Sequence, residues 1–188
     1  GIGGSNPPSS AMKSYLLETT AFLTGAIIMA LELCGFRILA PFVGVSIEVW
    51  TSIIGVILGS LSLGYFLGGK TADKKSSFEL LALIISLASC FVFLILIIRI
   101  PVLSLFQNVQ IALGFKSLLS SVALFFIPNV LLGMVTPIIT KLGIKSLKNA
   151  GKTVGRIYAM STFGSIIGTF ITGFILLSLF SITQILVG

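Results

Sequence analysis

The chain has 188 residues, of which 56% are hydrophobic and 9% are charged, and its mean hydropathy is +1.17. Soluble proteins carry roughly 25% charged residues, so this composition excludes an ordinary soluble domain and predicts an integral membrane protein. The net charge of +7 does not indicate nucleic-acid binding, because the basic residues stand in short clusters between apolar runs and form no extended basic face.

The chain begins with a segment rich in glycine, serine and proline, which we interpret as a tag or linker remnant over residues 1–12. Residues 13–188 are predicted to form a single transmembrane domain. This part contains five apolar stretches near the roughly 20 residues that cross a bilayer, and none alternates as a strand would. The predicted fold is therefore an all-α integral membrane bundle with spans at 14–39, 48–69, 78–99, 117–140 and 154–180.

Two shorter apolar segments complete the chain. Residues 101–115 are too few to span a bilayer, and we expect them to form a helix that lies flat on the outer membrane surface. Residues 181–188 are apolar and carry no helix-stop signal, which is typical of the start of a sixth span. On this interpretation the chain is a truncated part of a longer protein.

The basic residues predict the orientation. They cluster in the loops after the second and fourth spans, and the positive-inside rule makes such loops cytoplasmic. The N-terminus is then also cytoplasmic, in a multi-pass protein of the cell membrane. The clustered residues are Lys70, Lys74, Lys75, Lys141, Lys145, Lys148, Lys152 and Arg156.

The first span holds the charges of greatest interest. A carboxylate at membrane depth costs a few kcal/mol, so Glu32 is a candidate ligand for a cation or proton, and we expect it to face the bundle interior. Glu18 lies within about 40° of Glu32 around the helix and either shares that path or is only interfacial. Arg37 points roughly 140° away from Glu32, so we expect Arg37 to meet the membrane surface or a different helix. A purely structural role for Glu32, as a buried charge pair, stays open.

Glycines in two of the spans repeat the same spacing. Gly55, Gly59 and Gly64 are separated by four and five residues, and so are Gly164, Gly168 and Gly173. Small residues at this spacing let membrane helices approach closely. Because the two spans cross the bilayer in opposite senses, the pattern predicts an inverted repeat of three plus three helices.

The fourth span contains Pro128, Asn129 and Pro137. Proline frees a backbone carbonyl and asparagine adds a donor and an acceptor, so Asn129 is a candidate substrate ligand in a broken helix. The alternative is a tolerated kink. No histidine is present and the five acids are scattered, so we expect no metal site, no catalytic residue and no cofactor.

Four blocks in order carry a family resemblance: ALELCGFRILAPFVG, VWTSIIGVILGSLSLGYFLGGKTADK, LLGMVTPIITKLG and VGRIYAMSTFGSIIGTFITGFIL. They are similar to the membrane domain of fused major-facilitator/spermidine-synthase proteins. The resemblance implies a fold like half of a major facilitator, followed in that family by a soluble aminopropyltransferase-like domain. It also gives Asp73, in GGKTADKK, the role of clamping helix ends. The residues of the soluble domain are absent from this chain, so we expect it not to be an enzyme.

Two functions follow as hypotheses. The first is transport or binding of a small cationic solute such as a polyamine, with a homodimer enclosing the path. The second is a non-transporting membrane anchor for a cytoplasmic aminopropyltransferase-like domain. Both require the lipid bilayer as the surrounding partner.

Overall fold

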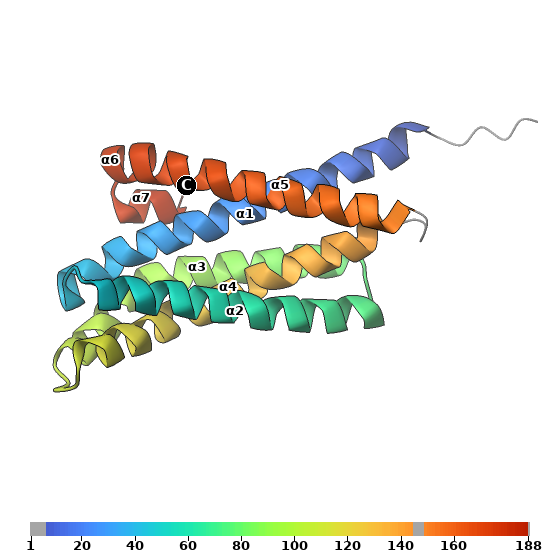
Figure 1. The fold of residues 1–188 in the computed structure, drawn as a ribbon. Helices are drawn as coiled ribbons and strands as arrows, with labels where there is room; N and C mark the ends of the chain where they lie inside the picture. Colours follow the sequence, from blue (N-terminus) through green and yellow to red (C-terminus); the bar gives the residue numbers. More distant parts are fainter. Residues whose placement is uncertain (1–6, 145–148, 188) are drawn as a thin grey trace, which may run out of the picture.

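The computed structural model describes residues 7–144 and 149–187, and every regular element in them is a helix. Five helices are long and apolar enough to cross a membrane, which confirms the expected all-α bundle (Figure 1). The fifth continues through a π-helical stretch, η2, and a last short turn, α6, before the chain folds back into α7. The elements are α1 (Pro7–Val43), α2 (Ile47–Lys74), α3 (Phe78–Gln107), α4 (Leu113–Gly143), α5 (Ala150–Phe170), η2 (Ile171–Leu176), α6 (Leu177–Leu179) and α7 (Ile182–Val187).

Short connections make consecutive helices antiparallel. Between α1 and α2 the chain turns at Gly44, whose φ of 79° lies in the left-handed region that favours glycine. Ser46 then caps α2 by accepting a hydrogen bond from the backbone N–H of Val49. Ser77 caps α3 in the same way, accepting from Leu80. These side-chain caps satisfy backbone donors that would otherwise be left unpaired at each helix start.

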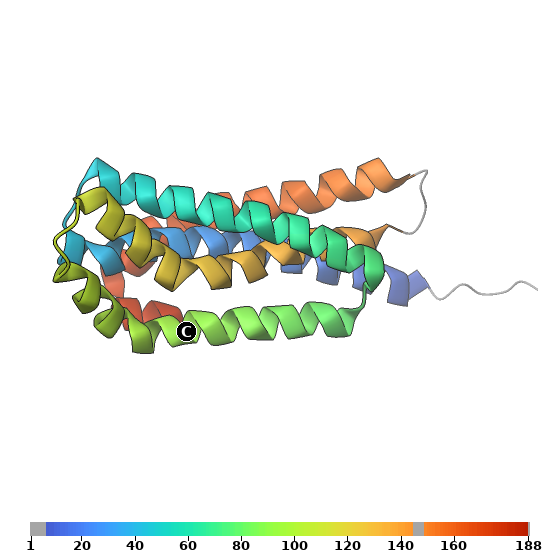
Figure 2. The same ribbon diagram turned by 90° about the horizontal axis from the view of Figure 1, so that it is seen from below.

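The helix expected on the membrane surface over 101–115 does not form. The structure instead extends α3 through Pro101 to Gln107, and α4 begins at Leu113. The yellow-green end of α3 bends away from the axis of the rest of the helix in Figure 2. Proline lacks the N–H that closes the helical ladder, which explains a bend at this position. Leu103, which is 1% exposed, holds this end in the main hydrophobic core.

The N-terminal end differs from the sequence expectation, whereas the C-terminal end forms a helix after the fifth span. Helix α1 begins at Pro7, inside the segment set aside as a linker, whereas residues 1–6 lie outside the described part. Residues 182–187 form the short helix α7, and the expected start of a sixth span stays a prediction. Ile182 and Leu186 of α7 pack against the main hydrophobic core.

Close packing of small residues joins α2 to α4. A Cβ atom added to Gly64 would collide with the carbonyl oxygen of Val130 and lie 2.9 Å from the Cα of Gly133. One turn further along, a Cβ on Gly68 would lie 2.7 Å from the Cα of Met134. The two backbones therefore touch over this stretch, which maximises dispersion contacts in a membrane where lipid offers no hydrophobic drive.

A second close pair joins α1 to α5. A Cβ on Gly164 would collide with the carbonyl oxygen of Phe22, and one on Gly168 would lie 2.6 Å from the Cα of Ala26. Gly25 meets the backbone of Ser161 in the same way. The Ser165 hydroxyl adds a hydrogen bond of 3.2 Å to the Gly25 carbonyl.

Within this chain, two glycines of the α2 series make no close helix contact. A Cβ added to Gly55 or Gly59 would meet nothing within 4 Å, so neither brings two helices of this chain together. Gly173 is also loose, since its Cβ would lie 3.9 Å from the Leu33 side chain. Equal spacing in sequence thus does not mean equal packing.

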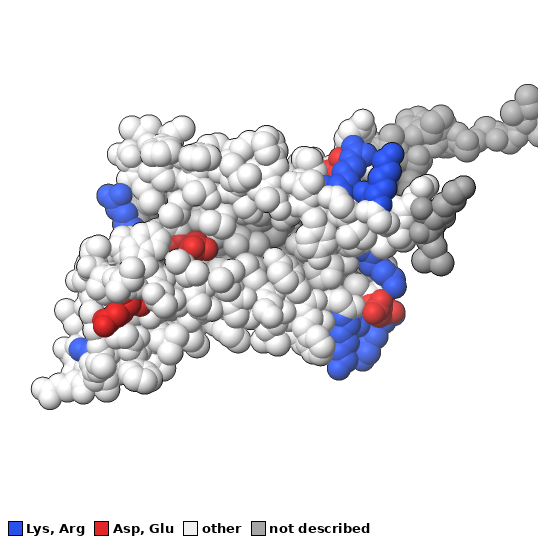
Figure 3. Space-filling view, in the orientation of Figure 1, with Lys and Arg blue, Asp and Glu red and all other residues white. Residues whose placement is uncertain are grey.

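Charged side chains gather at the two ends of the bundle. Figure 3 shows most Lys and Arg atoms at the end where α2 finishes and α5 starts, with few at the other end. We call the first the basic end. Its described basic residues, placed by the helix ends that they occupy, are Lys13, Lys70, Lys74, Lys75, Lys141, Lys152 and Arg156.

Candidate functional site

Glu32 lies on α1 and is partly buried. Two turns away on the same stripe, Gly25 meets α5, and one turn in the other direction Phe36 stacks on Trp50 of α2 with 4.1 Å between ring centroids. Among the described residues, Glu32 has neither a hydrogen-bond nor an ion-pair partner. The expectation that it faces the interior therefore holds only in part: its surface is shared between the bundle and the outside.

Glu18 is 7% exposed and has two partners. Its Oε2 lies 2.8 Å from Nη2 of Arg156 on α5, and its Oε1 accepts a hydrogen bond of 2.9 Å from Ser14. Fourteen residues of helix separate Glu18 from Glu32, or about 21 Å at 1.5 Å per residue. The structure therefore does not bring the two acids into one site.

Arg37 meets a different helix, one of the two outcomes expected for it. Its Nη1 donates a hydrogen bond of 2.8 Å to the carbonyl oxygen of Leu177 in α6. Leu177 directly follows the π-helical stretch η2. Backbone carbonyls at helix ends and at π-helical irregularities lack the N–H partner that a regular α-helix provides. The Arg37 guanidinium therefore donates a hydrogen bond to a backbone carbonyl at the end of the fifth helix.

Asn129 is fully buried in the middle of α4. Its Nδ2 donates a hydrogen bond of 2.8 Å to the Phe125 carbonyl, one turn earlier in the same helix, while its Oδ1 has no partner among the described residues. Helix α4 continues from Leu113 to Gly143 through both prolines. The arrangement is thus the tolerated kink and not a broken helix, and Asn129 lines neither of the cavities described below.

Asp73 pairs across the basic end with Lys141 of α4, at 2.8 Å between Oδ1 and Nζ. Both side chains are well exposed, at 74% and 49%. The pair joins the end of α2 to the end of α4, and the clamping role of Asp73 stays a prediction.

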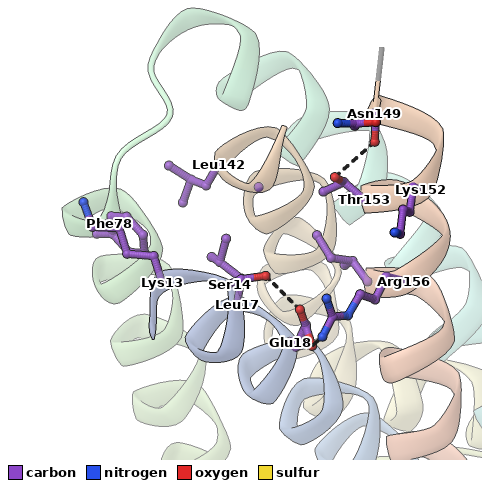
Figure 4. Close-up of a pocket in the computed structure, with 12 residues that line it drawn as sticks. Lys13, Ser14, Leu17, Glu18, Phe78, Leu142, Asn149, Lys152, Thr153 and Arg156 are labelled. Carbon is purple, nitrogen blue, oxygen red and sulfur yellow. Dashed lines mark hydrogen bonds and ion pairs between the residues drawn. The ribbon is translucent and has the colours of Figure 1, made fainter. Parts of the chain in front are cut away.

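A cavity of about 460 Å³ opens at the basic end, where the start of α1 and α5 meets the end of α4 and the start of α3 (Figure 4). We call it the basic cavity. Sequence reasoning missed it, because its basic residues come from opposite ends of the chain and were interpreted only as topology signals. Its polar lining residues are Lys13, Ser14, Glu18, Asn149, Lys152, Thr153 and Arg156.

A second, apolar groove of about 590 Å³ lies between α1 and α3 and is bordered by α7. Its few polar side chains are hydroxyls, Thr20, Thr24 and Ser89. Neither Glu32 nor Asn129 lines it.

The structure is that of a multi-pass helical membrane protein. It has five apolar helices of membrane-spanning length, its helices pack closely through glycines, and its charges lie mostly at the two ends. No family model, no curated protein and no solved structure matches this chain. The likeness to fused major-facilitator/spermidine-synthase proteins rests on the sequence blocks alone.

Proposed function

We propose that this chain is the membrane domain of a carrier that transports or binds a small cationic solute, such as a polyamine, with Glu32 as the charged ligand. The observation that carries the proposal is a partly buried carboxylate within a membrane-spanning helix that has no partner among the described residues. Such a group is expensive to keep in a bilayer and marks solute or proton paths in membrane proteins.

The contrast with two of the other acids supports this role. Glu18 and Asp73 each pair with a base, so their charges are compensated within the chain. The charge of Glu32 is left available for a cation. Partial burial lowers the local dielectric around Glu32 and would strengthen its attraction for a cationic amine.

Helix pairing supports a half-transporter architecture. Helix α1 packs closely on α5 and α2 packs closely on α4. An inverted repeat in which the first and second spans correspond to the fourth and fifth would make the α1–α5 pair equivalent to the α4–α2 pair, and the two close pairings support this proposal. The repeat remains part of the proposal.

A half-sized bundle needs a second copy to enclose a path, and α2 offers a surface for it. Gly55 and Gly59 are exposed and have open space beside them, so another helix backbone could approach closely there. We propose that the protein is a homodimer in the cell membrane with a cytoplasmic N-terminus. The gathering of basic residues at one end supports this orientation.

The test is uptake of labelled polyamine into proteoliposomes containing the purified chain. Wild type is expected to accumulate the solute, Glu32→Gln to lose uptake, and Glu48→Gln to keep it, because Glu48 is an exposed acid at the start of α2. If Glu32→Gln took up as much polyamine as Glu48→Gln, Glu32 would not be the ligand for the solute.

An absence of flux for every cation tested would instead favour the second function, a membrane anchor for a cytoplasmic aminopropyltransferase-like domain. The charge pairs at the basic end support that alternative, since Glu18–Arg156 and Asp73–Lys141 both join helices where such a domain would dock. It predicts that Glu32→Gln leaves every solute-binding measurement unchanged and alters only the stability of the bundle.

A further inference from the structure

The basic cavity has an excess of positive charge. Among the described residues that line it, three are basic, Lys13, Lys152 and Arg156, and one is acidic, Glu18. The Glu18 carboxylate already pairs with Arg156 and accepts a hydrogen bond from the Ser14 hydroxyl, so it has few free lone pairs for a ligand. The lining therefore retains about two positive charges, which favours an anion.

The charges lie on both sides of the space. Figure 4 shows Lys13 beside Phe78 on one side, and Lys152 and Arg156, both from α5, on the other. The first turn of α5 adds to this field, since its N-cap residue, Asn149, lines the cavity and makes no side-chain cap bond. Uncapped backbone N–H groups at a helix start carry partial positive charge.

The rest of the cavity is apolar. Leu17 of α1 and Ile157 of α5 are both almost fully buried, and Phe78 and Leu142 complete the apolar part of the lining. A small inorganic anion would leave these side chains without partners. An amphiphile with a phosphate head and a short apolar neck fits both kinds of surface, and a volume of about 460 Å³ suits a headgroup and not a whole lipid.

We propose that the basic cavity binds the phosphate group of an anionic phospholipid, with the headgroup between Lys13 and the α5 bases and the first part of the lipid against the apolar residues. The location supports this source of phosphate, because the cavity lies at an end of the membrane-spanning helices, where lipid headgroups lie. The site is independent of Glu32 and of any transport activity.

The test measures lipid retention by native mass spectrometry on the purified chain in detergent. Phosphatidylglycerol and phosphatidylcholine are compared at equal concentration, because they share acyl chains and differ in net charge. The variant Lys13→Gln/Lys152→Gln removes two charges from the cavity. Its control, Lys70→Gln/Lys75→Gln, removes two exposed charges at the same end that do not line the cavity.

Wild type and control are expected to retain phosphatidylglycerol in preference to phosphatidylcholine, and the cavity variant to bind it about tenfold more weakly, as loss of charge-assisted contacts predicts. Equal weakening in both variants would mean general attraction to the basic end and would overturn the proposal. If soluble glycerol 3-phosphate displaced the lipid at a similar concentration, the cavity would be a site for soluble phosphate esters. That result would overturn the proposal that its ligand is a phospholipid.

Glu18→Gln gives a second, opposite readout. It removes the acid that neutralises Arg156 and is expected to strengthen phosphatidylglycerol binding, although it removes a charge pair from the bundle. Weaker binding in this variant, with the fold intact by circular dichroism, would contradict a site selected by positive charge.

Discussion

Glu18 of α1 and Arg156 of α5 form an ion pair with 2.8 Å between Oε2 and Nη2, in which the glutamate side chain is 10% exposed and the arginine side chain 54%. The pair joins the first and fifth helices at the basic end. The two partners differ in burial. Loss of Arg156 therefore leaves a nearly buried carboxylate without a counter-charge, whereas loss of Glu18 leaves a half-exposed guanidinium without one.

We expect Arg156→Gln to lower the stability of the bundle by about 1–3 kcal/mol, since it leaves a nearly buried carboxylate without its base. Glu18→Gln should cost less, because the half-exposed arginine can turn to water. Thermal unfolding in detergent measures both, and the double variant should be more stable than the sum of the single losses implies. Strictly additive losses would show that the pair contributes nothing as a pair.

The α2 glycines offer a matched comparison within one helix. Gly64→Ala should destabilise the bundle by about 1–3 kcal/mol, because the added methyl group collides with the backbone of α4. Gly59→Ala should leave the stability of the monomer unchanged or raise it by up to about 1 kcal/mol, because open space surrounds Gly59. The thermal midpoints of the two variants in detergent check this order, and its reversal would contradict the observed packing of α2 on α4.

Arg37 and Arg99 each anchor a different part of the C-terminal region. Arg37 bonds to the Leu177 carbonyl and Arg99 donates 3.0 Å to the hydroxyl of Thr183. Arg37→Gln should therefore speed backbone hydrogen exchange over residues 171–179, whereas Arg99→Gln should speed it over residues 182–187. Exchange by mass spectrometry checks both, and identical patterns in the two variants would show that neither bond restrains its own segment.

The Asp73–Lys141 pair is well exposed, so its removal should matter little for stability. Asp73→Asn is expected to change the free energy of unfolding by less than about 1 kcal/mol, an effect that high salt reduces further. If Asp73 clamps helix ends during transport, as the family resemblance implies, uptake should fall while the thermal midpoint stays constant. A large loss of stability would instead make the pair a structural element.

Much of the fold could be predicted because each span must cross the hydrocarbon layer, which fixes its length and composition. The prediction over 101–115 failed for a local reason. Pro101 and the polar residues after it resemble a helix boundary, yet Leu103 is buried in the core and keeps the segment in α3. The burial of Leu103 depends on its neighbours in space, which sequence periodicity does not report.

The sequence by itself determined that the protein is a helical bundle of five membrane-length segments, with an acid inside the first and most of its bases at one end, because hydropathy and charge are properties of each segment alone. Only the tertiary structure decided which glycines touch another helix, since Gly55 and Gly64 lie on opposite faces of α2 and only Gly64 meets α4. It also gathered Lys13, Glu18, Lys152 and Arg156 around one cavity. Helices from opposite ends of the chain lie side by side through backbone contacts, and no pattern within either segment contains that information.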